Sequence, residues 1–343
     1  MKTNKFKIDD DDIGTGKTFV IAEVGSNHLG DLVSAKEHIA AAADAGADAV
    51  KFQSIKLDQL WHAPTKKIKA LHKKIDFAEE WHEELIRYAA KKNILFTSSP
   101  TYLKAVSIME EVDVPFFKIA SAQVGTFPQL ISAVAKTGKP TFFSTGIADY
   151  SLISRAVDLF KKHNHSKYAI FHCNSIYPTP YDAVNLGRME TYRRMFHCPI
   201  GFSDHTEGTA IVIAAVARGA SMIEKHFKLE GEIDSPDAQF SITPGQFSSM
   251  VESIRSVESA SGDKSRIKIE DSEEEFRESI RYKLVAKKKI FAGQSFSSAD
   301  FDYLRSSRGI DATNEEIICD NFIARKDIVS GSLIHYTDLV APK

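Results

Sequence analysis

The run Asp48-Ala-Val-Lys-Phe-Gln-Ser54 is a short apolar stretch of β-forming residues with a lysine at its centre. Runs of this kind, bounded by helical stretches, indicate buried strands. Seven more occur along the chain, and the starts of successive runs lie 22 to 46 residues apart. The other seven are Thr18–Gly25, Ile94–Pro100, Phe116–Ser121, Thr141–Gly146, Tyr168–Ser175, Pro199–His205 and Met222–Phe227.

The segments between these runs have the period and composition of helices, as in Ser34–Ala45, Phe77–Lys92 and Ser151–Lys162. Strand–helix alternation predicts parallel strands joined by right-handed crossovers. Eight repeats predict an α/β fold, a closed (β/α)₈ TIM barrel, over residues 1–262. An open doubly wound sheet is the alternative, but neither GxGxxG after the first strand nor GxxxxGK[ST] is present.

The chain changes character after the barrel. Residues 263–280 are rich in charge and predict a linker or a solvated helix. Residues 281–343 predict a small β-rich domain, with strands at Tyr282–Ala286 and Phe301–Arg305. The segment from Phe322 to Gly331 echoes the first of these units, with a strand, a charged turn and a glycine.

Composition narrows the function classes. The formal net charge of −2 gives no general indication of nucleic acid or an anionic membrane as a partner. No apolar run approaches the ~20 residues that span a bilayer, and the N-terminus lacks the apolar core of a secretory signal. Three dispersed cysteines indicate a reducing compartment, so we expect a cytoplasmic protein.

Polar residues gather where the predicted strands end, which in a (β/α)₈ barrel is where catalytic side chains lie. Lys51 and Lys118 stand inside apolar runs, and a buried ammonium group without a partner is expensive, so each should face an anion. The other candidates at strand ends are Glu23, Gln53, Thr97, Ser98, Ser99, Ser121, Ser144, Thr145, His172, Asn174, Ser175, Ser203, Asp204, His205, Glu224, Lys225 and His226.

These residue types support more than one chemistry. Two lysines with several hydroxyls suit a phosphate and a carboxylate. His205 and His226 could share one divalent cation with a carboxylate such as Glu23 or Asp237 nearby. A buried strand lysine is also the signature of an imine-forming aldolase. A catalytically inactive barrel with a carbohydrate-binding C-terminal domain is the non-enzymatic alternative.

Several motifs resemble the sialic acid synthase family, in order and over nearly the whole chain. The segment from Arg281 resembles the antifreeze-like (SAF) domain of that family. The motifs are Ile21–Asp31, Ala45–Gln53, Lys118-Ile-Ala-Ser, Ser144-Thr-Gly, Cys173-Asn-Ser-Ile-Tyr-Pro-Thr, Gly201-Phe-Ser-Asp-His-Thr, Ile223-Glu-Lys-His-Phe and Ser235-Pro-Asp.

The resemblance implies a reaction. Phosphoenolpyruvate would condense with an N-acylated amino sugar, such as N-acetylmannosamine, to give a nonulosonic acid and phosphate. Glu23 would transfer a proton or order water, and His205 and His226 would hold Mn²⁺, with Mg²⁺ or Co²⁺ as alternatives. The phosphoenolpyruvate set would be Lys51, Lys118, Ser121, Ser144, Ser175 and Ser203, the sugar set Glu23, Gln53, Tyr177 and Asp237, with Ser98 and Gln123 as further substrate contacts.

The resemblance also implies a domain-swapped homodimer in which an arginine of the SAF domain approaches the acyl group of the sugar. Arg305 is the candidate, with Arg308 as the alternative. The chain departs from the family pattern at Gln123, where a glutamate is usual, and at Ser306-Ser-Arg-Gly-Ile310. The phrase from Asp234 to Ser241 is similar to synthases of pseudaminic or legionaminic acid, so the departures bear on the acceptor sugar.

Overall fold

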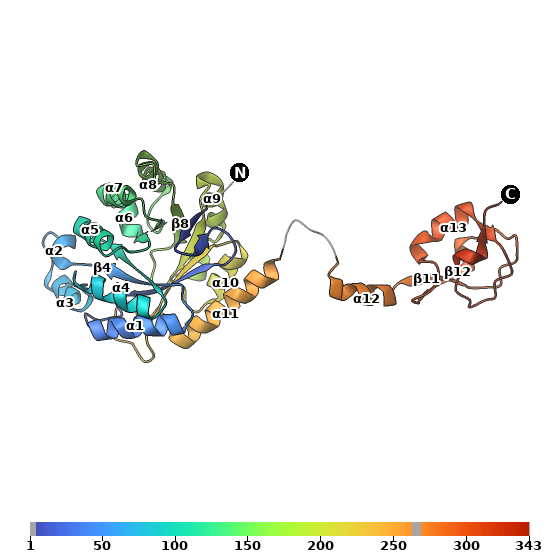
Figure 1. Ribbon diagram of the computed structural model, residues 1–343, viewed down its shortest axis with the longest axis horizontal. Coiled ribbons are helices and arrows are strands. Elements are labelled where there is room, and N and C mark those ends of the chain that lie inside the picture. Colours follow the sequence, from blue (N-terminus) through green and yellow to red (C-terminus); the bar gives the residue numbers. More distant parts are fainter. Residues whose placement is uncertain (1–4, 263–268, 343) are drawn as a thin grey trace. The chain divides into compact units, whose positions relative to one another are not determined.

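The computed structural model describes residues 5–262 and 269–342 and divides the chain into two compact units, Met1–Gly262 and Asp263–Lys343. The first unit holds eight parallel strands encircled by helices (Figure 1), which confirms the predicted (β/α)₈ barrel. The strands are β3 (Phe19–Gly25), β4 (Ala49–Ser54), β5 (Leu95–Pro100), β6 (Phe117–Ile119), β7 (Thr141–Ser144), β8 (Tyr168–Cys173), β9 (Ile200–Asp204) and β10 (Met222–His226).

The strands follow the order β5-β4-β3-β10-β9-β8-β7-β6, so each lies beside its sequence neighbour. A bond from Thr97 Oγ1 to the Phe116 carbonyl, 2.7 Å long, links the segments of the two end strands. The surrounding helices are α1 (Leu32–Asp44), α2 (Leu57–Leu60), α3 (Lys66–Ile75), α4 (Trp81–Lys91), α5 (Leu103–Glu111), α6 (Ser121–Thr126), α7 (Pro128–Thr137), α8 (Tyr150–Lys162), α9 (Gly187–Phe196), α10 (Ala210–Ala217) and α11 (Pro244–Ser261), with a 3₁₀ turn η1 (Tyr181–Ala183).

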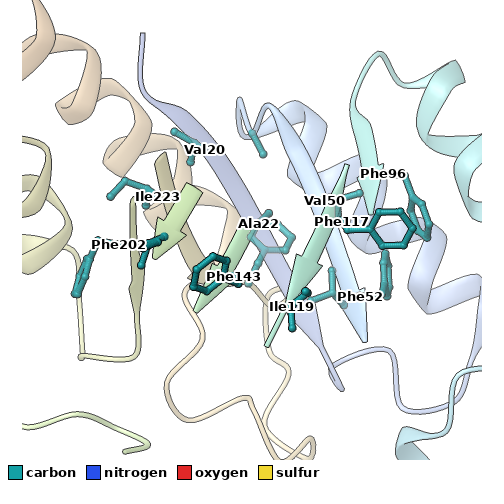
Figure 2. Packing of buried hydrophobic residues seen from close by; sticks show 14 of the residues in the cluster. Val20, Ala22, Val50, Phe52, Phe96, Phe117, Ile119, Phe143, Phe202 and Ile223 are labelled. Atoms are coloured by element: carbon teal, nitrogen blue, oxygen red, sulfur yellow. The ribbon is translucent and has the colours of Figure 1, made fainter. Parts of the chain in front are cut away.

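Side chains alternate across the barrel wall, as the pleat of a strand requires. On β4, Val50 and Phe52 pack outward in the main core between strands and helices (Figure 2), whereas Ala49 belongs to a second core inside the barrel. Lys51 and Gln53 share the inward parity of Ala49 and line the cavity above it. The alternation therefore decides which polar residues can reach a substrate.

A hairpin of two short strands closes the amino end of the barrel, and the sequence analysis did not predict it. Strands β1 (Phe6–Ile8) and β2 (Asp11–Ile13) are antiparallel. Phe6, Ile8 and Ile13 join the inner core with the buried aromatic rings of the barrel. Burying such a side chain contributes about 1.5–3 kcal/mol, so the hairpin helps to fill the amino end of the barrel.

The second unit has its own core and two antiparallel strand pairs, which confirms the predicted strands at Tyr282–Ala286 (β11) and Phe301–Arg305 (β12). Of the predicted linker, residues 263–268 lie outside the described residues, and Asp271–Ser279 forms α12 with every side chain exposed. The remaining elements are α13 (Glu315–Asn321), β13 (Ile323–Ala324), β14 (Leu339–Val340) and the 3₁₀ turns η2 (Ser298–Asp300), η3 (Ala312–Asn314) and η4 (Tyr336–Asp338).

Within residues 5–262 and 269–342, no helix combines the length and the apolar character needed to cross a membrane.

Candidate active site

A polar cavity opens at the carboxyl end of the barrel strands. It brings together most of the residues predicted from the sequence, each from the end of a different strand. The lining consists of Glu23, Lys51, Gln53, Lys118, Ala120, Ser121, Ser144, Cys173, Tyr177, Ser203, His205, Glu224 and His226.

Two buried lysines and two buried glutamates form the floor of the cavity. Lys51 Nζ lies 2.7 Å from Glu23 Oε2 and 3.8 Å from Glu224 Oε2. Lys118 Nζ lies 3.1 Å from Glu224 Oε1, which also accepts a 2.9 Å hydrogen bond from Ser203 Oγ. Each lysine therefore faces an anion, as expected, but the anions are carboxylates of the protein. Glu224 lies between the two ammonium groups.

The two carboxyl groups have opposite pKa shifts. Burial raises the pKa of Glu23 to about 7, against the opposing effect of Lys51. Burial also acts on Glu224, but Lys118 and Lys51 outweigh it and lower the pKa of that carboxyl to about 2. Neighbouring carboxyl groups with separated pKa values can divide the work between a proton carrier and a fixed charge. The pKa values suit Glu23 to exchange a proton near neutral pH and leave Glu224 ionised.

A group of hydroxyls lies beside the lysines. Ser121 Oγ and Ser175 Oγ are 3.0 Å apart. Ser144 Oγ is buried and has no hydrogen-bond partner among the described residues, although its side chain lines the cavity. A buried hydroxyl without a protein partner is uncommon, and one that lines a cavity is available to bond a ligand. These three serine hydroxyls are therefore suited to donate hydrogen bonds to the oxygens of a small anion.

Gly146 provides the space in which the serine hydroxyls lie. Its φ is +38°, and a Cβ there would collide with Ser121 Cβ and come within 2.5 Å of Ser175 Oγ. We expect Gly146→Ala to weaken binding of an anionic substrate about 10–100-fold, since displaced hydroxyls lose charge-assisted bonds of about 1.5–3 kcal/mol. Isothermal titration with phosphoenolpyruvate measures this, and Gly138→Ala, at a positive-φ glycine with open space around it, is the matched control. Equal weakening by both substitutions would contradict the assignment.

His205 and His226 lie together in the cavity, with ring centroids 5.3 Å apart. His205 Nδ1 donates a 2.6 Å bond to the Asn174 carbonyl, which leaves its Nε2 as a free lone pair. Burial lowers the pKa of both imidazoles to about 3, helped for His205 by His226 and for His226 by Lys51. Both rings are therefore neutral at physiological pH, which is the form that binds metal ions.

No carboxylate completes a metal site in the described part of the chain, where no group of three or more His, Cys, Asp and Glu residues could hold a cation. Glu23 is engaged with Lys51, and its Oε1 accepts a 2.6 Å bond from Gln53. Asp237 Oδ2 accepts 2.8 Å bonds from both the backbone nitrogen and the hydroxyl of Ser26. The donor set fits a cation held by two imidazoles, with the remaining positions open to water and substrate.

Two of the predicted sugar contacts, Tyr177 and Asp237, lie beside the histidines. The Tyr177 ring lies 4.2 Å from the His205 ring, measured between centroids, and is half exposed. A Cβ at Gly25, where φ is +56°, would collide with Asp237 Oδ2 and approach His226. Glycine at this position therefore lets Asp237 lie close to His226.

Four predicted substrate contacts of the first unit do not line the cavity, namely Ser98, Gln123, Ser175 and Asp237, although Ser175 bonds the lining residue Ser121. Ser98 faces the helical layer, where its hydroxyl bonds Ser54 Oγ at 2.8 Å, so the prediction for Ser98 is wrong. The neighbouring Ser99 has the inward parity and accepts a 3.1 Å bond from Lys51. Gln123 is buried on α6, outside the cavity lining, with its Oε1 unpartnered among the described residues.

Arg305 belongs to the second unit, where its guanidinium lies 5.5 Å from the centre of the Tyr282 ring. Arg308 lies in the loop after β12, and its backbone nitrogen donates to Ser306 Oγ. The contact of Arg305 or Arg308 with a sugar therefore stays a prediction.

Ser98 and Ser99 point to opposite faces of β5, so their substitutions should have different effects. We expect Ser99→Ala to weaken substrate turnover by about tenfold, because Lys51 loses an oriented neutral partner and has more freedom to move. Ser98→Ala should leave turnover unchanged and cost about 1 kcal/mol of folding free energy, the usual value of a hydrogen bond. Steady-state kinetics and urea unfolding of the two variants separate the effects. Loss of turnover in Ser98→Ala alone would contradict the observed parity.

Glu224 and Cys173 also line the cavity. The sequence analysis placed Glu224 at a strand end but gave it no role, and it did not name Cys173 as a candidate. Two signals pointed to Glu224: it shares the strand parity of His226, and two buried lysines need anionic partners. Cys173 is a free buried thiol whose Sγ lies 3.9 Å from His205 Nδ1. Burial raises its pKa to about 11, so it remains a neutral thiol in the wall of the cavity.

Comparison with known proteins gives consistent results. A model described as the NeuB family matches residues 38–266. An uncharacterized protein of Methanocaldococcus jannaschii is 39% identical over 98% of this chain and 99% of its own length. The N,N'-diacetyllegionaminic acid synthase of Campylobacter jejuni is 37% identical over 88% of this chain and 94% of its own.

A crystal structure of N-acetylneuraminic acid (sialic acid) synthetase from Leptospira borgpetersenii, in complex with citrate, matches with a TM-score of 0.75 and 32% identity. The match covers 80% of this chain and 96% of that one. Because the family model and these relatives agree over most of its length, the chain belongs to the NeuB family.

Proposed function

We propose that this protein condenses phosphoenolpyruvate with an open-chain N-acylated hexosamine, giving a nonulosonic acid and inorganic phosphate. This is the chemistry of a carbon–carbon bond-forming transferase. The observation that carries the proposal is the buried pair Lys51 and Lys118 beside the unpartnered hydroxyl of Ser144. Two cations and several hydroxyls at the closed end of a cavity suit a substrate that has both a phosphate and a carboxylate.

The chemistry follows from where the groups lie. The enol carbon of phosphoenolpyruvate attacks the aldehyde carbon of the sugar and forms the new carbon–carbon bond. Water adds to the cationic second carbon, and the tetrahedral intermediate then expels phosphate by breaking its carbon–oxygen bond. Lys51 and Lys118 stabilise the charge that develops on the leaving phosphate. Glu23, with a pKa of about 7, can take up or release the proton that these steps move.

A divalent cation fits the neutral imidazoles of His205 and His226, and we propose Mn²⁺, with Mg²⁺ or Co²⁺ as substitutes. Such an ion would supply a Lewis acid for the aldehyde oxygen. Gln53, Tyr177 and Asp237 would orient the hydroxyls of the sugar.

The second unit is proposed to be an antifreeze-like (SAF) domain. Its strands and turns agree with the sequence resemblance, and an exposed arginine, Arg305 or Arg308, would meet the acyl group of the sugar in a domain-swapped homodimer. We place the enzyme in the cytoplasm, where phosphoenolpyruvate is made and where its free thiols would stay reduced.

The acceptor sugar has a specific alternative within the same reaction. The 37% identity to an N,N'-diacetyllegionaminic acid synthase, over 88% of this chain, favours a diacetylated acceptor over N-acetylmannosamine. A pseudaminic acid precursor is the related option.

An imine mechanism is the second candidate, because burial lowers the pKa of Lys118 as an imine-forming lysine requires. Its 3.1 Å contact with Glu224 opposes this, because the pair favours the charged amine.

The test is a panel of N-acetylated and N,N'-diacetylated hexosamines with phosphoenolpyruvate and Mn²⁺. We expect phosphate release with at least one acceptor, and no borohydride-stable adduct with pyruvate. Trapping of pyruvate, without phosphate release from any sugar, would support the imine reaction and contradict the proposal.

A further inference from the structure

A buried ion pair lies on the outer side of the barrel wall, beside the two histidines. Lys225 Nζ lies 2.7 Å from Asp204 Oδ2, and neither side chain has any exposed surface. Lys225 also donates a 2.5 Å bond to the Thr206 carbonyl, and Asp204 accepts bonds from the backbone nitrogen and the hydroxyl of Thr206. The proposed reaction uses neither charge.

Strand parity separates this pair from the cavity. On β10, Glu224 and His226 line the cavity, whereas Ile223 and Phe227 pack in the core between strands and helices. Lys225 falls between the two cavity residues and therefore points to the helical side. Asp204 likewise points to the helical side, because its neighbours Ser203 and His205 both line the cavity.

The pair joins the ends of the two strands that carry the imidazoles. Lys225 and Asp204 are partners in the β10–β9 register, and each immediately precedes one of the histidines. The bonds to Thr206 fix the chain on the other side of His205, so this histidine stands between two anchored residues. A buried ion pair adds little stability compared with apolar residues, but it can select one arrangement of the chain.

We infer that Lys225 and Asp204 are positioning residues that set the spacing of His205 and His226 for a divalent cation. The inference rests on the metal site in the proposed function. A loss of the pair would let the two strand ends shift independently, and cation affinity depends steeply on ligand geometry. Removal of supporting interactions around metal ligands typically weakens binding ~10–100-fold.

The test compares Mn²⁺ binding with folding in the full-length protein. Mn²⁺ binding is measured by the loss of the free-ion electron paramagnetic resonance signal, and folding by calorimetric Tm. The main variant is Asp204→Asn/Lys225→Met, which removes both charges and leaves no unpaired ion. The matched control is Lys283→Met, which removes another buried lysine, paired with Asp311 in the second unit.

We expect the double variant to bind Mn²⁺ at least about tenfold more weakly while remaining folded at the assay temperature, and the control to bind normally. If the double variant does not fold, Asp204→Glu keeps the charge but lengthens the side chain, and it should also weaken binding. Unchanged Mn²⁺ affinity in either folded variant would overturn the inference.

If the unaltered protein binds no Mn²⁺, the metal site and this inference both fail. Phosphate release from phosphoenolpyruvate then decides separately whether the proposed condensation stands.

Discussion

Lys118→Met should reduce the rate of phosphate release from phosphoenolpyruvate by at least about 10²–10³-fold, the usual effect of removing one group that stabilises a developing charge. Lys118 lies at the bottom of the cavity with 2% of its surface exposed, and its ammonium group is 3.1 Å from Glu224 and 5.4 Å from the centre of the Phe171 ring. Water cannot replace this charge at such a depth. Single-turnover measurement with saturating substrates reports the effect on the chemical steps.

Lys118→Met alone should also destabilise the folded protein, so a second variant is needed that separates the loss of stability from the loss of activity. Loss of one partner of a buried pair costs about 3–5 kcal/mol, because Glu224 would keep its charge with less compensation. In Lys118→Met/Glu224→Gln both charges are removed, and we expect stability to recover while activity stays low. Lys139→Met, at a lysine paired with Asp113 on the outside of the barrel, should retain activity. Near-normal turnover in the folded double variant would contradict a role for Lys118 in phosphate departure.

Glu23→Gln should lower kcat by about 10²–10⁴-fold, the range for loss of a general acid or base. Glutamine keeps the shape and can still contact Gln53 and Lys51, but it cannot exchange a proton near neutral pH. We expect the pH profile of kcat/KM to lose the limb near pH 7 that belongs to Glu23. A profile that keeps this limb in the variant would assign the ionisation to another group.

The same substitution has a predictable effect on stability. The pKa of Glu23 is raised from 4.5 to about 7 in the folded protein, so the folded state holds a proton that the unfolded state has lost. The contribution of Glu23 to stability is therefore complete below pH 4.5 and is lost as pH rises through 7. Glutamine has no such loss, so the stability of Glu23→Gln relative to the unaltered protein should increase between pH 5 and 7.5. Urea unfolding at both pH values measures it, and a constant difference would contradict the raised pKa.

The barrel could be predicted from the sequence because the same pattern, an apolar run followed by a helical segment, occurs eight times. Each strand of the wall is buried on both faces, so all eight appear in the sequence as apolar runs. The hairpin at Phe6–Ile8 and Asp11–Ile13 has strands of three residues each, which are too short to show a period. Its role depends on filling the end of a barrel, and that follows only from the closed fold.

The site was predictable as a set of strand ends but not as a set of contacts. Parity within a run distinguishes Ser99 from Ser98, and a one-residue error in parity reverses the face. The position of Glu224 between two lysines requires three strands in register. That no third ligand joins the histidines among residues 5–262 and 269–342 follows only from the full geometry. Gln123 shows a further limit, because a helix begins at Ser121 and turns its side chain out of the cavity lining.

The central claim is that phosphate leaves phosphoenolpyruvate by cleavage of its carbon–oxygen bond during condensation with a sugar. The most direct measurement uses phosphoenolpyruvate labelled with ¹⁸O at the bridging position, incubated with Mn²⁺ and the acceptor that supports turnover. The account predicts that the label leaves with inorganic phosphate, one phosphate for each nonulosonic acid formed. Label retained in the sugar product, or phosphate released equally without a sugar, would contradict it.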